Sequence, residues 1–202
     1  MGSHPMTRTL WALLLLLAAC SGPVSAPPAP TGEMIAFGAI SAREACFTCH
    51  GAAGEGAGAV PRIAGLDAGY AVKQLEDYAR ELRADAVMSP IARRLTAADR
   101  RAVAYFYEAL GRQPTPSAPA PPLYHAGDPA RGLIACARCH EGEGAAAAPR
   151  LGGQPAAYTI EQLDRWRRGV RRNDPNDMMG RAARPLTDAE IQALARYLEA
   201  NR

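Results

Sequence analysis

The sequence predicts an all-α protein made of two tandem copies of one small helical unit. Apolar residues recur at intervals of three and four, as in Val72, Leu75, Tyr78 and Leu82, which is the spacing of one helix face. No stretch shows the strong alternation with period two that predicts a strand. A long block of similarity also occurs twice, with a proline-rich segment between the copies.

The repeat consists of two matched blocks in each copy. "PRIAGLDAGYAVKQL" (61–75) matches "PRLGGQPAAYTIEQL" (149–163), and "MSPIARRLTAADRRAVAYF" (88–106) matches "MGRAARPLTDAEIQALARY" (179–197). Between the copies, "GRQPTPSAPAPP" has the composition of an extended linker. We therefore expect a first domain at 33–110, a linker at 111–122 and a second domain at 123–202.

The last helix of each copy has a predicted start. Thr96 is followed three residues later by Asp99, and Thr187 by Glu190. A hydroxyl followed at this distance by an acidic residue is typical of a capping box. Gly111 supplies the stop for the first of these helices.

The composition limits both the core and the partners. The chain has 202 residues, of which 48% are hydrophobic but only 6% aromatic. Small domains with so few large side chains usually need a metal, disulfides or a cofactor. The formal net charge of +3 is too small to argue for nucleic acid, and we predict no such partner. The basic segment "RWRRGVRR" (165–172) is expected to be a solvated helix face, although it could instead pair with an acidic group.

The first twenty residues have the composition of an export signal. Arg8 precedes an unbroken apolar run from Leu10 to Ala19, about half the length of a membrane-spanning helix. The residues "MGSHP" (1–5) before Met6 look like a cloning remnant or a misplaced start, and we leave them out of the fold prediction.

Cys20 ends the signal in "LAAC" (17–20), which resembles the lipobox of bacterial lipoproteins. The resemblance implies cleavage before Cys20 and a diacylglycerol on its thiol, so that the protein is anchored to a membrane. The proline-rich residues 21–32 would then form an extended tether. Ordinary cleavage after "VSA" (24–26) is the alternative, and it would discard Cys20.

The other four cysteines lie in two C-x-x-C-H motifs, "ACFTCHG" (45–51) and "ACARCHE" (135–141). A structural zinc ion needs four ligands, whereas each copy offers two cysteines and one histidine. A thioredoxin-like dithiol is expected beside a βαβ pattern, which this sequence lacks. The motif also marks c-type haem attachment, and two copies in register in an exported helical repeat favour this interpretation. It assigns thioether bonds to Cys46, Cys49, Cys136 and Cys139 and the proximal iron ligands to His50 and His140.

Two methionines are the candidates for the second axial position of each iron. Met88 and Met179 occupy matching positions of the repeat, in polar segments that contain glycine and proline. Met178 competes with Met179, but the alignment favours Met179. The remaining histidines, His4 and His125, cannot serve two equivalent sites. Histidine and methionine together fill both axial positions, which leaves no open coordination position and favours electron transfer.

With these motifs the chain resembles the dihaem cytochrome c4 family. The residues that carry the resemblance are "CFTCHG", "PRIAGL", "YAVKQL" and "MSPIARRLT" in the first copy, and "YHAGDPARGLIACARCHEG", "PRLGGQ", "YTIEQLDRW", "RRNDPNDMMGRAARPLT" and "EIQALARYL" in the second. The resemblance implies two cytochrome c domains with two covalently bound haem c groups near their interface. It also implies that the carbonyls of Pro61 and Pro149 orient the two motif histidines.

The copies differ in one loop. Glu81 stands where the second copy has Gly169, and the segment from Gln74 to Met88 is three residues shorter than that from Gln162 to Met179. We therefore expect the conformation of the loop before the first methionine to differ from its counterpart.

The resemblance implies a periplasmic electron carrier with redox proteins as partners. Electrons would pass from a quinol-oxidising complex or a dehydrogenase to a terminal oxidase or reductase. One alternative is the cytochrome subunit of a dehydrogenase, such as a sulfide-oxidising flavoprotein. A dihaem peroxidase or thiosulfate dehydrogenase is less compatible, because such an enzyme needs an open or unusual axial position. We therefore expect an electron-transfer protein and no catalytic residues.

Overall fold

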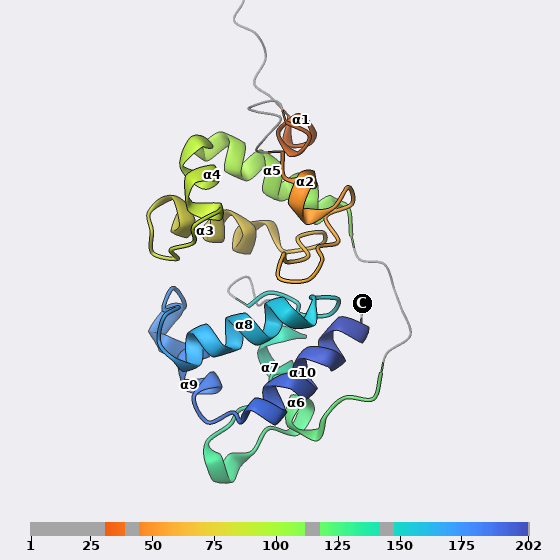
Figure 1. Cartoon of the computed structure of the whole chain (residues 1–202), viewed down its shortest axis with the longest axis vertical. Coiled ribbons are helices and arrows are strands. Elements are labelled where there is room, and N and C mark those ends of the chain that lie inside the picture. Colours follow the sequence, from red (N-terminus) through yellow and green to blue (C-terminus); the bar gives the residue numbers. More distant parts are fainter. Residues whose placement is uncertain (1–30, 39–44, 112–117, 142–147, 202) are drawn as a thin grey trace, which may run out of the picture.

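The computed structural model describes residues 31–38, 45–111, 118–141 and 148–201. They form two helical domains that lie one above the other in Figure 1. Within these ranges the extended pairing is limited to two isolated bridges, Ala57–Val60 and Asp128–Leu133. The predicted all-α class is confirmed. The export signal, Cys20, most of the tether and half of the linker lie outside the described residues.

Each domain ends in a long helix that packs on an earlier long helix. The first domain contains α1 (Gly32–Ala36), α2 (Phe47–His50), α3 (Ala68–Ala79), α4 (Met88–Arg94) and α5 (Ala97–Ala109). The second contains α6 (Pro122–Ala126), η2 (Pro129–Arg131), α7 (Ala137–His140), α8 (Ala156–Arg167), η3 (Pro175–Asp177), α9 (Met178–Ala183) and α10 (Asp188–Ala200). None of the described helices is long and apolar enough to span a membrane.

Side chains determine where the long helices begin. Thr96 and Thr187 each accept a hydrogen bond from the backbone three residues on, and the acidic residue there accepts one in return, so both predicted capping boxes are present. Asp67 caps α3 by accepting from the amide of Tyr70 at 2.8 Å. These caps satisfy amide groups that a helix leaves without partners at its first turn.

The buried apolar clusters are small. In the first domain the cluster joins α1 to α5, and its buried residues are Ile35, Ala36, Leu95, Val103 and Tyr107. In the second it joins α6 to α10 and consists of Tyr124, Leu133, Leu186, Ile191, Leu194, Tyr197 and Leu198. Clusters of five and seven buried residues are modest for domains of this length, as expected of a fold completed by a cofactor.

Helices α3 and α8 face each other where the two domains meet (Figure 1). Arg83 follows α3 and is buried. Its guanidinium donates within its own domain to Gln74 Oε1 at 2.8 Å. It also crosses the interface to Tyr158 Oη and Gln162 Oε1 of α8, both at 2.9 Å.

Arg171, which follows α8, makes the same set of bonds in the opposite direction. It donates to Gln162 Oε1 at 2.7 Å in its own domain. Across the interface it donates to Gln74 Oε1 at 3.1 Å and to Tyr70 Oη at 3.4 Å. The two domains are thus related by a pseudo-two-fold axis at this interface, and the two arginines exchange partners across it.

The basic segment 165–172 is therefore not a uniformly solvated helix face. Helix α8 ends at Arg167, and Gly169, with a φ of 67°, turns the chain back on itself. Arg171 consequently lies in the interface with 4% of its surface exposed, 3.9 Å from the centre of the Trp166 ring. The prediction is wrong for Arg171, because the helix ends before it.

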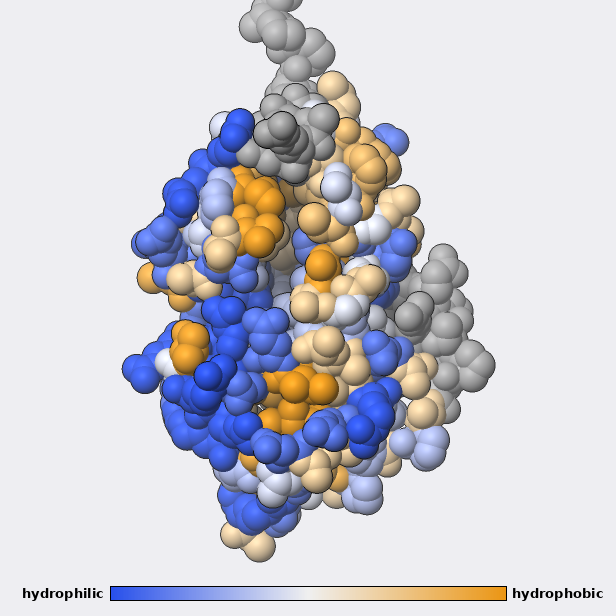
Figure 2. All heavy atoms as spheres, viewed as in Figure 1, coloured by the Kyte–Doolittle hydropathy of each residue, from blue (hydrophilic) through white to orange (hydrophobic). Residues whose placement is uncertain are grey.

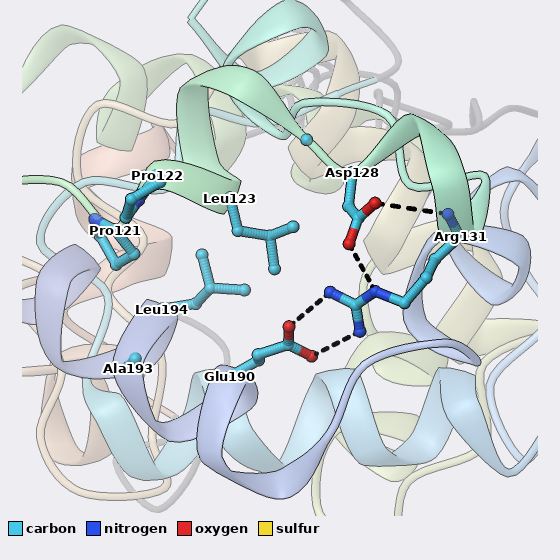
Figure 3. Close-up of a pocket in the computed structure, with 9 residues that line it drawn as sticks. Pro121, Pro122, Leu123, Asp128, Arg131, Glu190, Ala193 and Leu194 are labelled. Carbon is cyan, nitrogen blue, oxygen red and sulfur yellow. Dashed lines mark hydrogen bonds and ion pairs between the residues drawn. The ribbon is translucent and has the colours of Figure 1, made fainter.

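Arg131 joins the beginning of the second domain to its last helix. Figure 3 shows its guanidinium between two carboxylates, with Nε donating to Asp128 at 2.7 Å and Nη2 donating to Glu190 at 2.6 Å. Glu190 is also the acidic member of the capping box of α10. These bonds to Arg131 and to the backbone of Thr187 lower the pKa of Glu190 to about 2.

We predict that Glu190→Ala destabilises the protein by about 1 kcal/mol at neutral pH, because it removes the carboxylate that accepts from the amide of Thr187 in the capping box and from Arg131. Glu190→Gln keeps an acceptor for the cap and loses only the charge. Since the pKa of Glu190 falls from its ordinary 4.5 to about 2 on folding, the stability due to this charge is complete above pH 4.5. It is lost as the pH falls towards 2.

Denaturant unfolding of the wild type and the Glu190→Gln variant across this pH range tests the prediction. The difference between their free energies of unfolding should shrink below pH 4.5. Asp188→Asn is the control, because Asp188 lies at the start of the same helix but its side chain is 79% exposed and its ion pair should contribute little. A difference that stays constant down to pH 2 would contradict the assignment.

Candidate functional site

Each C-x-x-C-H motif forms a single helical turn. In α2 the amide of His50 donates to the carbonyl of Cys46 at 2.9 Å, and in α7 the amide of His140 donates to Cys136 at 3.0 Å. A turn of this size places the first cysteine, the second cysteine and the histidine along one short stretch of helix. The two turns occupy equivalent places in the two domains.

Both motif histidines are buried and held by a proline carbonyl. His50 is 7% and His140 8% exposed. His50 Nδ1 lies 2.8 Å from the carbonyl oxygen of Pro61, and His140 Nδ1 lies 2.6 Å from that of Pro149. A carbonyl only accepts, so Nδ1 must carry the proton and Nε2 keeps its lone pair. Burial lowers the pKa of both histidines, which favours the neutral ring that binds metal.

Among the described residues, the four motif cysteines form no disulfide. Burial raises the pKa of Cys46 and of Cys136. Each motif offers two cysteines within one helical turn, the arrangement that can add across the two vinyl groups of a haem.

A tight loop brings Pro61 back over His50. Ala57 and Val60 pair in a short bridge, and the amide of Gly56 donates to the carbonyl of His50 at 2.7 Å. A Cβ atom on Gly56 would lie 2.4 Å from the backbone of Pro61, so the close approach of the two segments requires glycine here. The loop geometry therefore determines the position of the carbonyl that orients the histidine.

The two candidate methionines lie in the first turn of short helices, Met88 as the first residue of α4 and Met179 as the second residue of α9, and they are anchored alike. The amide of Met88 donates to Asp85 Oδ1 at 2.8 Å, and the amide of Met179 donates to Asp174 Oδ2 at 2.6 Å. Both methionines are half-buried. Met178, the competitor of Met179, is 48% exposed.

The loops before these methionines differ less at their start than the sequence suggests. Glu81 adopts a φ of 60°, close to the 67° of Gly169, so the same left-handed turn occurs in both copies. A non-glycine residue in this region costs about 1 kcal/mol. Glu81 also forms an exposed ion pair with Arg93 at 2.6 Å. The longer second loop contains two further left-handed residues, Asn176 and Asp177.

The surroundings of the motifs fit a large apolar group that carries carboxylates. On the face shown in Figure 2, apolar side chains gather over each domain and are bordered by hydrophilic ones. Large apolar residues near the motifs and loops are exposed: Leu82 by 56%, Val87 by 59%, Ile134 by 62% and Val170 by 61%. Within the described part of the chain, the buried indole N–H of Trp166 has no acceptor. Haem supplies both an apolar ring and acceptor oxygens, so these residues fit it.

Sequence reasoning missed the residues of the domain interface. The repeat showed Tyr70 with Tyr158 and Gln74 with Gln162 as matched pairs but suggested no role for them. Arg83 and Arg171 follow their glutamines at the same spacing, and this spacing was the available signal. Cys20, the predicted lipid site, lies outside the described residues, so the structure leaves that prediction untested.

Each half of the chain matches a model of a cytochrome family. Residues 36–110 match the family model described as cytochrome c, and residues 132–198 match the model described as cytochrome c oxidase, cbb3-type, subunit III. The chain is 42% identical over 173 residues to a thiosulfate dehydrogenase electron acceptor from Stutzerimonas stutzeri, covering 79% of this chain and 80% of that protein. It is 36% identical to cytochrome c4 from Thiocapsa roseopersicina, covering 80% of this chain and 90% of that protein.

Solved structures give a similar result. The thiosulfate dehydrogenase TsdBA from Marichromatium purpuratum superposes with a TM-score of 0.74 at 37% identity over 85% of this chain, which spans 40% of that longer chain. Reduced cytochrome c4 from Pseudomonas stutzeri superposes with a TM-score of 0.68 at 30% identity. That match covers 78% of this chain and 93% of the other.

Proposed function

The chain belongs to the dihaem cytochrome c4 family, and from this we propose that it is an exported carrier that takes electrons from a thiosulfate dehydrogenase. The observation that carries the partner assignment is the similarity to two proteins named as thiosulfate dehydrogenase electron acceptors, at 42% and 41% identity. The TM-score of 0.74 with TsdBA supports it. These values exceed those of the cytochromes c4 reported above.

The haem iron supplies a one-electron couple between its ferric and ferrous states. In our proposal, the cysteine pairs hold the two haems covalently, and His50 and His140 bind iron through Nε2. The proline carbonyls keep each imidazole in the tautomer that leaves Nε2 free.

Met88 and Met179 supply the second axial ligands in this proposal. Both are half-buried, and the backbone amide of each donates to an aspartate, Asp85 three residues before Met88 and Asp174 five residues before Met179. This anchoring holds the sulfur-bearing segment in place when iron changes oxidation state. A histidine and a methionine from the protein would together leave no coordination position open to a substrate, so we propose a carrier without catalytic residues.

A dihaem carrier suits a dehydrogenase that removes an electron pair, because each haem can accept one electron. The runner-up function is a respiratory carrier between a quinol-oxidising complex and a terminal oxidase. The relatives named cytochrome c4 favour that alternative. We place the protein in the periplasm, attached to a membrane through a lipid on Cys20 and the tether of residues 21–32. The support for this anchor is the lipobox-like "LAAC" sequence.

We predict that Met179→Leu converts one of the two haems to a high-spin form and lowers its reduction potential, because the iron loses its sulfur ligand. Met88→Leu should do the same to the other haem. Met178→Leu is the matched control and should leave both haems low-spin. Electron paramagnetic resonance and spectroelectrochemical titration of the purified holoproteins measure these properties. If only the Met178→Leu variant shows a high-spin haem in the second domain, Met178 is the iron ligand there and the assignment of Met179 is wrong.

The partner assignment predicts rapid haem reduction by a thiosulfate dehydrogenase in the presence of thiosulfate. Stopped-flow absorbance should show both haems becoming reduced, whereas thiosulfate without the enzyme should leave them oxidised. Reduction by a quinol-oxidising complex but not by the dehydrogenase would favour the respiratory alternative. Co-purification with a flavoprotein after gentle detergent extraction would favour the subunit of a sulfide-oxidising enzyme.

The anchor predicts that Cys20→Ser moves the protein from the membrane fraction to the soluble periplasmic fraction. Mass spectrometry of the wild-type protein from membranes should show two covalent haems and a lipid on Cys20. A wild-type protein that is soluble and begins at Pro27 would overturn the anchor and leave the two haems unaffected.

A further inference from the structure

Helix α3 of the first domain contacts the loop that carries the methionine of the second domain. Lys73 Nζ donates to the carbonyl of Asn173 at 2.6 Å. The amide of the Asn173 side chain donates to Asp77 Oδ2 at 2.6 Å and to Gln74 Oε1 at 3.0 Å. The next residue, Asp174, accepts from the amide of Met179. A continuous path of bonds therefore joins one domain's helix to the other domain's methionine.

Helix α8 makes the reciprocal contact with the first domain. Arg165 Nη2 donates to the carbonyl of Ala84 at 2.8 Å. The next residue, Asp85, accepts from the amide of Met88 at 2.8 Å and donates its own amide to Ser89 Oγ at 3.1 Å. In both domains the cross-domain bond therefore ends on the residue just before the aspartate that caps the methionine.

The two contacts share a position but not a chemistry. Asp77 and Arg165 stand at the same place in the repeat, three residues after the matched glutamines. One is an acid paired with Lys73 at 2.5 Å, and the other is a base. The two domains therefore contact each other's methionine loops from equivalent positions, although the side chains at those positions differ.

The two matched side chains that make these cross-domain contacts are largely buried. The side chain of Asp77 is 10% exposed and that of Arg165 20%, and both adjoin the buried bonds of Arg83 and Arg171. Hydrogen bonds of partly buried charged groups are stronger than those at an open surface. A carbonyl held in this way restrains the backbone that carries the following aspartate.

We propose that the docking of each domain sets the methionine ligation of the other domain's haem, with Lys73 and Asp77 as positioning residues for Met179 and Arg165 as the positioning residue for Met88. This inference rests on the proposed histidine–methionine ligation. It makes the potential and ligation state of each haem depend on residues of the opposite domain.

The second domain depends more on this contact than the first. Its loop from Gln162 to Met179 is three residues longer than the matching loop, and it contains the left-handed residues Asn176 and Asp177. Longer loops are held less firmly by their own ends. The second loop also receives bonds from three side chains of α3, whereas Arg165 is the α8 side chain bonded to Ala84.

The test uses the full-length holoprotein with the double variant Lys73→Met/Asp77→Leu. Replacing a partly buried ion pair by apolar residues of similar size is often neutral for folding, so the variant should fold. We expect the haem of the second domain to show a lower potential and a larger high-spin fraction, with the first haem unchanged. Amide hydrogen exchange over residues 173–179 should become about tenfold faster.

Arg165→Met should have the same kind of effect on the other domain. It should lower the potential of the first domain's haem and speed amide exchange over residues 84–88, with a smaller magnitude. Arg165→Lys keeps a donor and should restore the wild-type values. Arg80→Met is the control for charge, because it removes one positive charge from an exposed site at the end of α3. It should leave both haems unchanged.

The variants Met88→Leu and Met179→Leu assign each potential to its domain. If these two variants leave the spectra unchanged, the ligation itself is wrong and the proposed function fails with it. If they behave as expected but the cross-domain variants alter neither haem, the inference is overturned and the carrier function stands. An effect confined to the haem of the mutated domain would also overturn it.

Discussion

The hydrogen bond from a histidine Nδ1–H to a proline carbonyl is the contact on which each haem site depends. It determines the tautomer, and so leaves Nε2 available to iron. The carbonyl reaches this place because the glycine-containing loop at Gly56 turns tightly over α2. The next residue, Arg62, donates its amide to Gln154 of the second domain at 3.1 Å and accepts from it at 2.7 Å. A contact inside one haem site is therefore continuous with the domain interface.

The interface consists largely of polar groups that need partners from both domains. Arg83 and Arg171 are buried cations that donate to oxygens of glutamine and tyrosine side chains. Arg171 also donates to Asn173 Oδ1 at 2.9 Å. Each also lies over an aromatic ring, Tyr78 and Trp166 respectively. Burying a cation is costly unless its donors are satisfied, and here that requires both domains together. This explains how the interface can hold the two domains in one relative orientation.

The chain is similar both to proteins named as thiosulfate dehydrogenase electron acceptors and to cytochromes c4. The ligand residues of a histidine–methionine cytochrome tune its potential and keep substrate from iron, but they do not choose the donor. Partner choice depends on surfaces and charges outside the ligand set. The higher identity to thiosulfate dehydrogenase electron acceptors than to the cytochromes c4 compared here is therefore informative about partners, because the haem motifs alone would not separate the two groups.

The sequence by itself determined the elements whose cause is local: the C-x-x-C-H turns, the capping boxes at Thr96 and Thr187, and the repeat that predicts two helical domains. Each follows from residues within a few positions of one another. Only the tertiary structure decided that Arg171 is buried, that Glu81 takes a glycine-like conformation, and that α3 contacts the loop of Met179. The burial of Arg171 and the contact of α3 with the loop of Met179 depend on groups about a hundred positions apart, which meet only when the two domains dock.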